Sequence, residues 1–171
     1  RAAKEIDELN AQIGAERVLS ECGNALTSQS VGPKIFWLKK NRPEVFAQTK
    51  MILTCTSFLA HRLTGRYVID QYSAPNNAPF YNAEALAWSD AIAPGIIDLS
   101  LLPEISWTTD IAGGVTKKAA LETGLAEGTP VICGTIDAAA EAVSVGAIAP
   151  GDMMLMYGST IFIIALTDKP V

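Results

Sequence analysis

The sequence GTPVICGTIDAAAEAV, residues 128–143, contains the change from strand to helix around which the chain is organised. Residues 130–133 are an apolar run with β-branched side chains between two glycines, which predicts a short buried strand. Residues 138–145 are almost all good helix formers, so the chain is predicted to enter a helix directly afterwards. Asp137 therefore falls at the carboxyl end of a buried strand, which is where ligands bind in open α/β sheets.

A second motif follows closely along the chain. Residues 152–157 and 161–167 are two apolar, strand-like runs, and the short segment Gly158, Ser159, Thr160 separates them. This arrangement predicts a β-hairpin. A glycine and two hydroxyl residues at its tip offer backbone N–H groups and side-chain donors to an anion. Together with the carboxylate of the preceding motif, the tip indicates a base beside a phosphate cradle.

Four segments of the chain resemble motifs of the FGGY family of carbohydrate kinases, in the order in which that family has them. They are KIFWLKKN at 34–41, FLAHRLTG at 58–65 followed by Asp70, GTID at 134–137, and GST at 158–160. The resemblance runs from Ser28 to Val171. Some positions depart from the family pattern: Val31 stands where the pattern has Pro, Ser or Thr, Ala74 stands where Asp or Asn is common, and Ala138 stands where Gln or Asn is common.

The resemblance implies an α/β chain with the actin-like ATPase fold, which is ribonuclease H-like. Residues 1–147 would be the rear part of the first lobe, on the substrate side. Residues 148–171 would open the second lobe with its β-hairpin, on the nucleotide side. In the family, a phosphate loop lies near the true N-terminus and the adenosine pocket lies far downstream. The chain is therefore expected to be an internal piece of a longer protein and to be inactive by itself.

For function, the resemblance implies a xylulokinase-like enzyme of the cytoplasm that phosphorylates a hydroxyl of a sugar or polyol with ATP and Mg²⁺. Asp137 would act as the general base and contact the substrate, because a carboxylate must accept the proton of the attacking hydroxyl. Gly158, Ser159 and Thr160 would contact the nucleotide phosphates, and Gln29 would lie near the sugar. The identity of the sugar and the oligomeric state are left open, a homodimer included.

Other interpretations stay open for the same residues. Asp137 is also a suitable N-cap for the helix that follows it, and Gln29 is also typical of a solvated loop. Another actin-like phosphotransferase is compatible with these motifs. So is a sugar-binding or assembly module that keeps the fold without catalysis, for which Ala138 is the main indication. His61 is the only histidine, and no hydrolase constellation of residue types lies near it, so a structural role is expected.

Composition argues against several other classes of function. The 171 residues carry a formal net charge of -5 without a basic stripe, so nucleic acid is not an expected partner. No apolar run approaches the roughly 18–20 residues of a membrane span. The 3 cysteines are widely spaced, which predicts buried free thiols rather than a metal site. Glycine motifs of the Walker and dinucleotide-binding types do not occur in the sequence.

Hydrophobic spacing and stop signals predict the remaining elements. Helices are expected at residues 2–13, 16–22, 33–41, 43–48, 57–63, 83–92 and 117–123. Residues 51–54 are expected to form a strand, and residues 94–107 are expected to connect elements over the surface. Trp37 is expected to pack in the core beside its apolar neighbours. A boundary between two lobes is expected in the segment 146–151, which contains two glycines and a proline.

Overall fold

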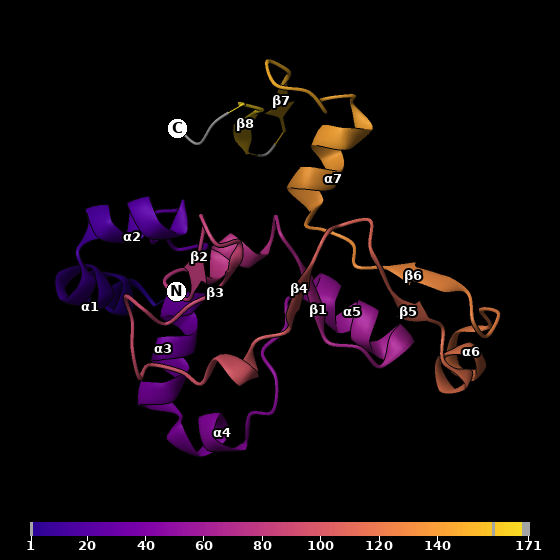
Figure 1. Cartoon of the computed structure of the whole chain (residues 1–171), viewed down its shortest axis with the longest axis horizontal. Coiled ribbons are helices and arrows are strands. Elements are labelled where there is room, and N and C mark those ends of the chain that lie inside the picture. The colour runs from indigo at the N-terminus through magenta and orange to yellow at the C-terminus, as the bar shows by residue number, and fades with distance from the viewer. Residues whose placement is uncertain (1, 159, 169–171) are drawn as a thin grey trace. The chain divides into compact units, whose positions relative to one another are not determined.

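The computed structural model describes residues 2–158 and 160–168 of the chain. The chain divides into two compact units, Arg1–Gly134 and Thr135–Val171, which we call unit 1 and unit 2. Figure 1 labels the elements of both units along the sequence. Helices and strands occur in each unit, so the predicted α/β class is confirmed.

Most of the helices of unit 1 end at a glycine. The helices are α1 Ala3–Ile13, α2 Ala15–Cys22, α3 Gly32–Asn41, α4 Pro43–Gln48, α5 Cys55–Thr64 and α6 Lys117–Thr123. The Thr54 side chain accepts the N–H of Ser57 at the start of α5 and so satisfies an amide of the first turn. Apart from small shifts at their ends, these helices confirm the predictions. In the part of the chain that the structure describes, none of the helices is long and apolar enough to span a membrane.

The strands of unit 1 are short and pair in twos. β1 Val68–Asp70 runs parallel to β4 Glu104–Ser106, β2 Tyr81–Asn82 is antiparallel to β3 Ala87–Trp88, and β5 Ile111–Gly114 is antiparallel to β6 Pro130–Ile132. The 3₁₀ helices η1 Ala74–Asn77 and η2 Leu99–Leu101 lie in the connections. The β1–β4 ladder and the β5–β6 ladder each join strands that are distant in sequence, so both ladders depend on tertiary packing.

The main core of unit 1 lies where α1, α2 and α3 meet the chain between Ala78 and Leu102. Its buried side chains are Leu9, Val18, Cys22, Leu26, Ile35, Ala78, Phe80, Ile92, Ala93, Ile96, Ile97 and Leu102. Gly32 lets the start of α3 approach this segment closely, because a Cβ at Gly32 would lie 2.0 Å from the carbonyl oxygen of Ala78. Only glycine fits at that contact.

Residues 83–92 do not form the predicted helix. β3 lies within them, and Leu86 has a φ of 52°, outside the right-handed helical region. Trp88 packs against the main core, and its indole N–H donates to the carbonyl oxygen of Pro103 at 2.7 Å. These contacts come from residues far along the chain, so the local hydrophobic spacing favoured the wrong element.

Two further elements of unit 1 differ from the predictions. Residues 51–54 do not form a strand and have no regular structure. Residues 94–107 are not a surface connector, because Ile96, Ile97 and Leu102 are buried in the main core and β4 lies within the segment. Short apolar runs between prolines look like loops in sequence, and only their tertiary neighbours show that they are buried.

Two predictions of burial are also wrong. Trp37 is 41% exposed, because Ile35 is the side chain that α3 buries in the core. β6 confirms the strand predicted at residues 130–133, but Pro130 is exposed and Ile132 is 50% exposed. In the described part of the chain β6 pairs only with β5, so it is not the inner strand of a larger sheet.

Unit 2 contains α7 Asp137–Ser144 and an antiparallel hairpin of β7 Met153–Tyr157 and β8 Ile161–Ala165. The helix and the hairpin confirm the predictions for this region. Alternate hairpin residues on one face form a small core with α7, namely Met154, Phe162 and Ile164 with Ala142 and Ala147. The residues on the other face are exposed, namely Met153, Leu155, Tyr157, Ile161 and Ile163.

Asp152 holds the turn that leads from α7 to β7. Its carboxylate accepts the backbone N–H groups of Ala149 at 2.8 Å and Ile148 at 3.0 Å. These hydrogen bonds favour the charged form and lower the pKa of Asp152 below its ordinary value. The turn therefore fixes where the hairpin begins relative to the helix of the same unit.

Candidate active site

The turn after β6 sets the position at which α7 begins. Gly134 has a φ of 76°, and Ile136 is the N-cap with an extended backbone. Asp137 is therefore the first residue of the helix and not its N-cap. Its Oδ1 accepts the N–H of Ala138 at 2.8 Å. A carboxylate is favoured in this first turn, because the free amides there carry partial positive charge.

The hairpin tip is short because the two strands stay paired up to Tyr157 opposite Ile161. Within the tip, the N–H of Gly158 donates to the carbonyl oxygen of Thr160 at 3.1 Å. Among the described residues other than its chain neighbours, the atom nearest to a Cβ added at Gly158 is that same oxygen, at 4.0 Å, so this glycine has open space on the described side. Ser159 lies outside the described residues, and its predicted contact with phosphate stays a prediction.

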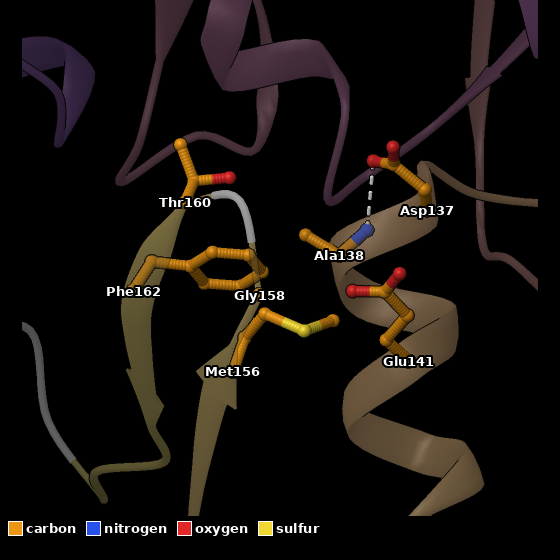
Figure 2. Close-up of a pocket in the computed structure, with 7 residues that line it drawn as sticks. All are labelled: Asp137, Ala138, Glu141, Met156, Gly158, Thr160 and Phe162. Atoms are coloured by element: carbon orange, nitrogen blue, oxygen red, sulfur yellow. Dashed lines mark hydrogen bonds between the residues drawn. The ribbon is translucent and has the colours of Figure 1, made fainter.

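Unit 2 has a pocket of about 300 Å³ between α7 and the hairpin, shown in Figure 2. The described residues that line it are Asp137, Ala138, Glu141, Met156, Gly158, Thr160 and Phe162. Asp137, Gly158 and Thr160, which the sequence placed in one site, therefore line one pocket. Pockets for small molecules span about 300–1,000 Å³, so this pocket suits a small ligand or one part of a larger ligand.

Gln29 belongs to unit 1, in the loop before α3. Its backbone N–H donates to the Thr27 hydroxyl at 3.2 Å, and its carbonyl oxygen accepts Lys34 Nζ at 2.9 Å. These bonds fix the backbone of an exposed residue. Gln29 and the pocket lie in different units, and its predicted contact with a sugar stays a prediction.

Glu141, Met156 and Phe162 line the pocket but were not among the predicted site residues. Glu141 lies four residues after Asp137, and side chains at this spacing share one face of a helix. Met156 and Phe162 stand opposite each other in the hairpin. In Figure 2 the carboxylates of Asp137 and Glu141 lie on the helix side, and Met156 and Phe162 lie across from them.

The pocket is acidic. Asp137 and Glu141 are carboxylates, and none of the described lining residues carries a positive charge. From residue 135 to residue 171 the sequence has a single cation, Lys169, which lies outside the described residues. The pocket therefore combines hydrogen-bond acceptors, the Thr160 hydroxyl and an apolar wall. It can hold a ligand that donates hydrogen bonds, and it can accept a proton from that ligand.

The histidine and the cysteines lie outside the pocket lining. His61 stacks on Tyr67 with ring centroids 4.1 Å apart. Burial raises the pKa of Cys22 and Cys133 to about 11, so both thiols stay protonated at neutral pH. Cys55 is exposed, although the sequence predicted buried thiols. Among the described residues, no group of three or more His, Cys, Asp or Glu side chains could hold a metal ion.

Comparison with known proteins adds a family and relatives of known structure. Residues 1–144 match the FGGY family of carbohydrate kinases, N-terminal domain. The chain is 30% identical to a xylulose kinase of Escherichia coli K12, over 94% of this chain and 32% of that protein. It is 26% identical to an autoinducer-2 kinase of Yersinia enterocolitica, over 100% of this chain and 33% of that protein.

A solved structure shows the same fold over nearly the whole chain. The xylulose kinase from Rhodospirillum rubrum matches with a TM-score of 0.91 and 31% sequence identity. The match covers 96% of this chain and 34% of that one. The chain therefore spans about a third of the length of the relatives that it matches.

Proposed function

Because the chain belongs to the FGGY family of carbohydrate kinases, we propose that the complete protein transfers the γ-phosphoryl group of ATP to a hydroxyl of a sugar or polyol. The resemblance noted in the sequence is confirmed at the level of the family, and the relatives include xylulose kinases. The proposed reaction and the roles of the site residues are more specific than family membership, and the pocket of unit 2 supports them.

The observation that carries the proposal is that Asp137, Gly158 and Thr160 line one pocket. Asp137 is the general base of the proposed reaction. Its carboxylate accepts the proton of the substrate hydroxyl while the oxygen of that hydroxyl bonds to the γ-phosphorus. The bond from the γ-phosphorus to the bridging oxygen of ADP breaks in the same step. Such a reaction depends mainly on positioning and on stabilising negative charge, so the part of the carboxylate is to orient the hydroxyl and accept its proton.

The hairpin tip is the proposed contact for the nucleotide phosphates. The Thr160 hydroxyl is a donor in the pocket, and the open space around Gly158 lets a phosphate group come close to the backbone. The Gly158 N–H already donates to Thr160 within the tip, so the Thr160 hydroxyl is the better-supported contact of the two. Ser159 is proposed as a further contact on the sequence pattern alone.

Magnesium fits this pocket as a companion of the nucleotide. Mg²⁺ prefers oxygen ligands and is usually held by one or two carboxylates together with substrate phosphates. The Thr160 hydroxyl is an oxygen of this kind in the pocket, and the Asp137 carboxylate would stay free of the ion to accept the proton. When bound, the ion would offset negative charge on the phosphates, which reduces their repulsion from the carboxylates.

We also propose the lobe assignment and its consequences for the isolated chain. Residues 1–147 would be the rear part of the first lobe and residues 148–171 the opening hairpin of the second lobe. The chain spans about a third of its relatives, so the 171 residues alone are proposed to be inactive and to bind ATP weakly. A cytoplasmic location and a homodimer stay predictions from the family resemblance.

A non-catalytic sugar-binding or assembly module is the second candidate. One observation favours it: the side chain that points into the pocket next to Asp137 is the methyl group of Ala138, which offers no hydrogen bond to a sugar hydroxyl. Under this alternative the complete protein binds a sugar without sugar-dependent turnover of ATP.

Replacing Asp137 in the complete protein tests the proposed function. We expect Asp137→Asn to lower sugar-dependent turnover of ATP by about two to four orders of magnitude, the usual effect of losing a positioned acid or base. Folding should survive, because Asp137 is exposed and losing a contact at a helix start costs only about 1 kcal/mol. Circular dichroism and a thermal melt check the fold.

Asp168→Asn is the matched control, because it removes one negative charge from the same unit outside the pocket lining. This control should leave turnover unchanged. A folded Asp137→Asn protein with near-native turnover would contradict the assignment of the base. A wild-type protein that binds sugar but never turns over ATP would favour the non-catalytic module.

A further inference from the structure

Glu141 lies in the pocket of unit 2, and the proposed reaction gives it no role. Its side chain is half-buried between α7 and the hairpin, on the same helix face as Asp137. A carboxylate has two oxygens that accept hydrogen bonds, so this side chain can bind a ligand that donates them. None of the described lining residues is a cation that would pair with it instead.

The lining of the pocket defines the chemistry of a suitable ligand. On the helix side, two carboxylates accept hydrogen bonds. On the other side, the Phe162 ring and the Met156 side chain form an apolar wall, and the Ala138 methyl group faces the pocket from the helix side. A ligand that matches both sides donates hydrogen bonds from hydroxyl groups and presents C–H groups to the wall. Neutral sugars and polyols have both features.

From this geometry we propose that Glu141 is a specificity-determining residue that restricts the pocket to neutral sugars and polyols and rejects sugar acids. The inference rests on the proposed function, since it concerns the sugar that is phosphorylated there. The Glu141 carboxylate accepts a hydrogen bond from a second hydroxyl of the sugar whose reacting hydroxyl faces Asp137. A sugar acid brings a third negative charge between these carboxylates, and like charges at close range are disfavoured.

The charge repulsion that disfavours a sugar acid does not exclude the nucleotide. Mg²⁺ accompanies ATP and offsets part of the phosphate charge, whereas the carboxylate of a sugar acid carries no such ion with it. The selection by charge therefore acts on the sugar. It separates neutral substrates from aldonates of the same length, which differ mainly by one carboxylate.

Calorimetric titration of the complete protein with matched probes tests this inference. The neutral probes are xylitol and D-xylulose, and the anionic probes are D-xylonate, which has the same five carbons, and the six-carbon D-gluconate. We expect the wild type to bind a neutral probe at least about tenfold more tightly than either aldonate, as one close charge repulsion provides. Glu141→Gln should reduce this preference by about tenfold and keep neutral binding within about threefold, because the amide oxygen still accepts a hydrogen bond.

Glu141→Ala and Asp168→Asn complete the set. Glu141→Ala should lose about tenfold in affinity for the neutral probe, as expected for a missing hydrogen-bond partner, while its affinity for aldonates does not fall. Asp168→Asn, with the same loss of charge outside the pocket lining, should keep the wild-type preference. A merely structural role for Glu141 would lower the affinity for both kinds of probe together.

Three results would overturn the inference: an unchanged preference in Glu141→Gln, a wild type that binds an aldonate more tightly than the neutral probes, or a wild type that binds neither neutral probe. The Asp137→Asn experiment distinguishes a failure of this inference from a failure of the proposed function. If Asp137→Asn loses turnover while Glu141→Gln leaves the preference unchanged, only the role of Glu141 fails. If Asp137→Asn retains turnover, the assignment of Asp137 as the base fails, and if the wild type shows no sugar-dependent turnover of ATP, the proposed reaction itself fails.

Discussion

The two units differ in how their side chains are buried. In unit 1, Leu9, Val18 and Phe80 are completely buried in a core that many elements share. In unit 2, the most buried side chains are those of Ala142, Ala147 and Met154, and the outer face of the hairpin is exposed. Apolar burial is the dominant favourable term in folding, so unit 1 carries most of the stability of this chain.

The pocket residues show the opposite distribution. Every described residue that lines the pocket belongs to unit 2, where close packing is sparse. Substitutions in unit 1 should therefore act mainly on folding, and substitutions at the pocket should act mainly on ligands. Four predictions test the differences in packing between the units and within unit 2, beginning with the largest expected effect.

Two glycines provide the sharpest contrast between the units. Gly32→Ala places a Cβ 2.0 Å from the carbonyl oxygen of Ala78, so α3 must move away from the core, and we expect a loss of about 3 kcal/mol or more in the free energy of unfolding. In Gly158→Ala the new Cβ meets no atom closer than 4.0 Å among the described residues beyond its chain neighbours, so stability should change by less than about 0.5 kcal/mol. Urea denaturation of the 171-residue chain measures both, and equal losses would contradict the contrast.

Two adjacent methionines test the difference between the faces of the hairpin. Met154 is 6% exposed and packs on α7, whereas Met153 is 67% exposed. We expect Met154→Ala to destabilise the chain by about 2 kcal/mol and Met153→Ala by less than about 0.5 kcal/mol. Chemical denaturation followed by circular dichroism measures the pair. An equally large effect at Met153 would mean that the outer face is covered, for example by a second copy of the chain.

Substitutions at the hairpin tip should lower the affinity for nucleotide and leave the stability of the fold unchanged. Gly158→Val fills the open space at the tip and should weaken binding of Mg-ATP to the complete protein by more than about tenfold through steric exclusion of phosphate. Thr160→Ala removes one hydroxyl donor and should weaken it by about fivefold, which corresponds to about 1 kcal/mol. Calorimetric titration measures both affinities. Wild-type affinity in both variants would remove the tip from the site.

The smallest expected effect concerns acid stability and the turn at Asp152. The folded pKa of Asp152 is below its unfolded value, because the Ala149 and Ile148 N–H groups hydrogen-bond to the charged carboxylate. Its contribution to stability is therefore present above the unfolded pKa of about 4 and is lost as the pH falls through the folded pKa. Comparing the unfolding of wild type and Asp152→Asn from pH 6 to pH 2.5 should show a difference that shrinks with acid. A difference that is constant with pH would contradict this assignment.

The elements of unit 2 could be predicted from sequence because their signals are local. The glycine after the predicted strand, the run of alanines and the two alternating runs each determine structure over a few residues. Asp137 was predicted as a site residue because it stands at the change between two such signals and in a segment that resembles a family motif. The pocket partners needed tertiary information, because only the structure shows which face of the hairpin turns towards α7. Once that face is known, Phe162 follows from strand alternation and Glu141 from the helical spacing.

Unit 1 shows why the remaining elements could not be predicted. The segment with Trp88 has spacing compatible with a helix, but it is held by Phe80 and Pro103 in an extended form. Ile96 and Ile97 lie between prolines and glycine, which suggests a loop, yet they complete the main core. In both cases distant parts of the chain decide the local structure, and a short window of sequence does not contain them.

The central claim is that sugar and nucleotide phosphates meet at the pocket of unit 2. Hydrogen–deuterium exchange of the complete protein, with and without a non-hydrolysable Mg-ATP analogue and D-xylulose, tests this claim most directly. We predict slower exchange in peptides that cover residues 134–141 and 157–162 when both ligands are bound. Ligand binding that is detected by calorimetry but leaves both of these segments unprotected would contradict the account.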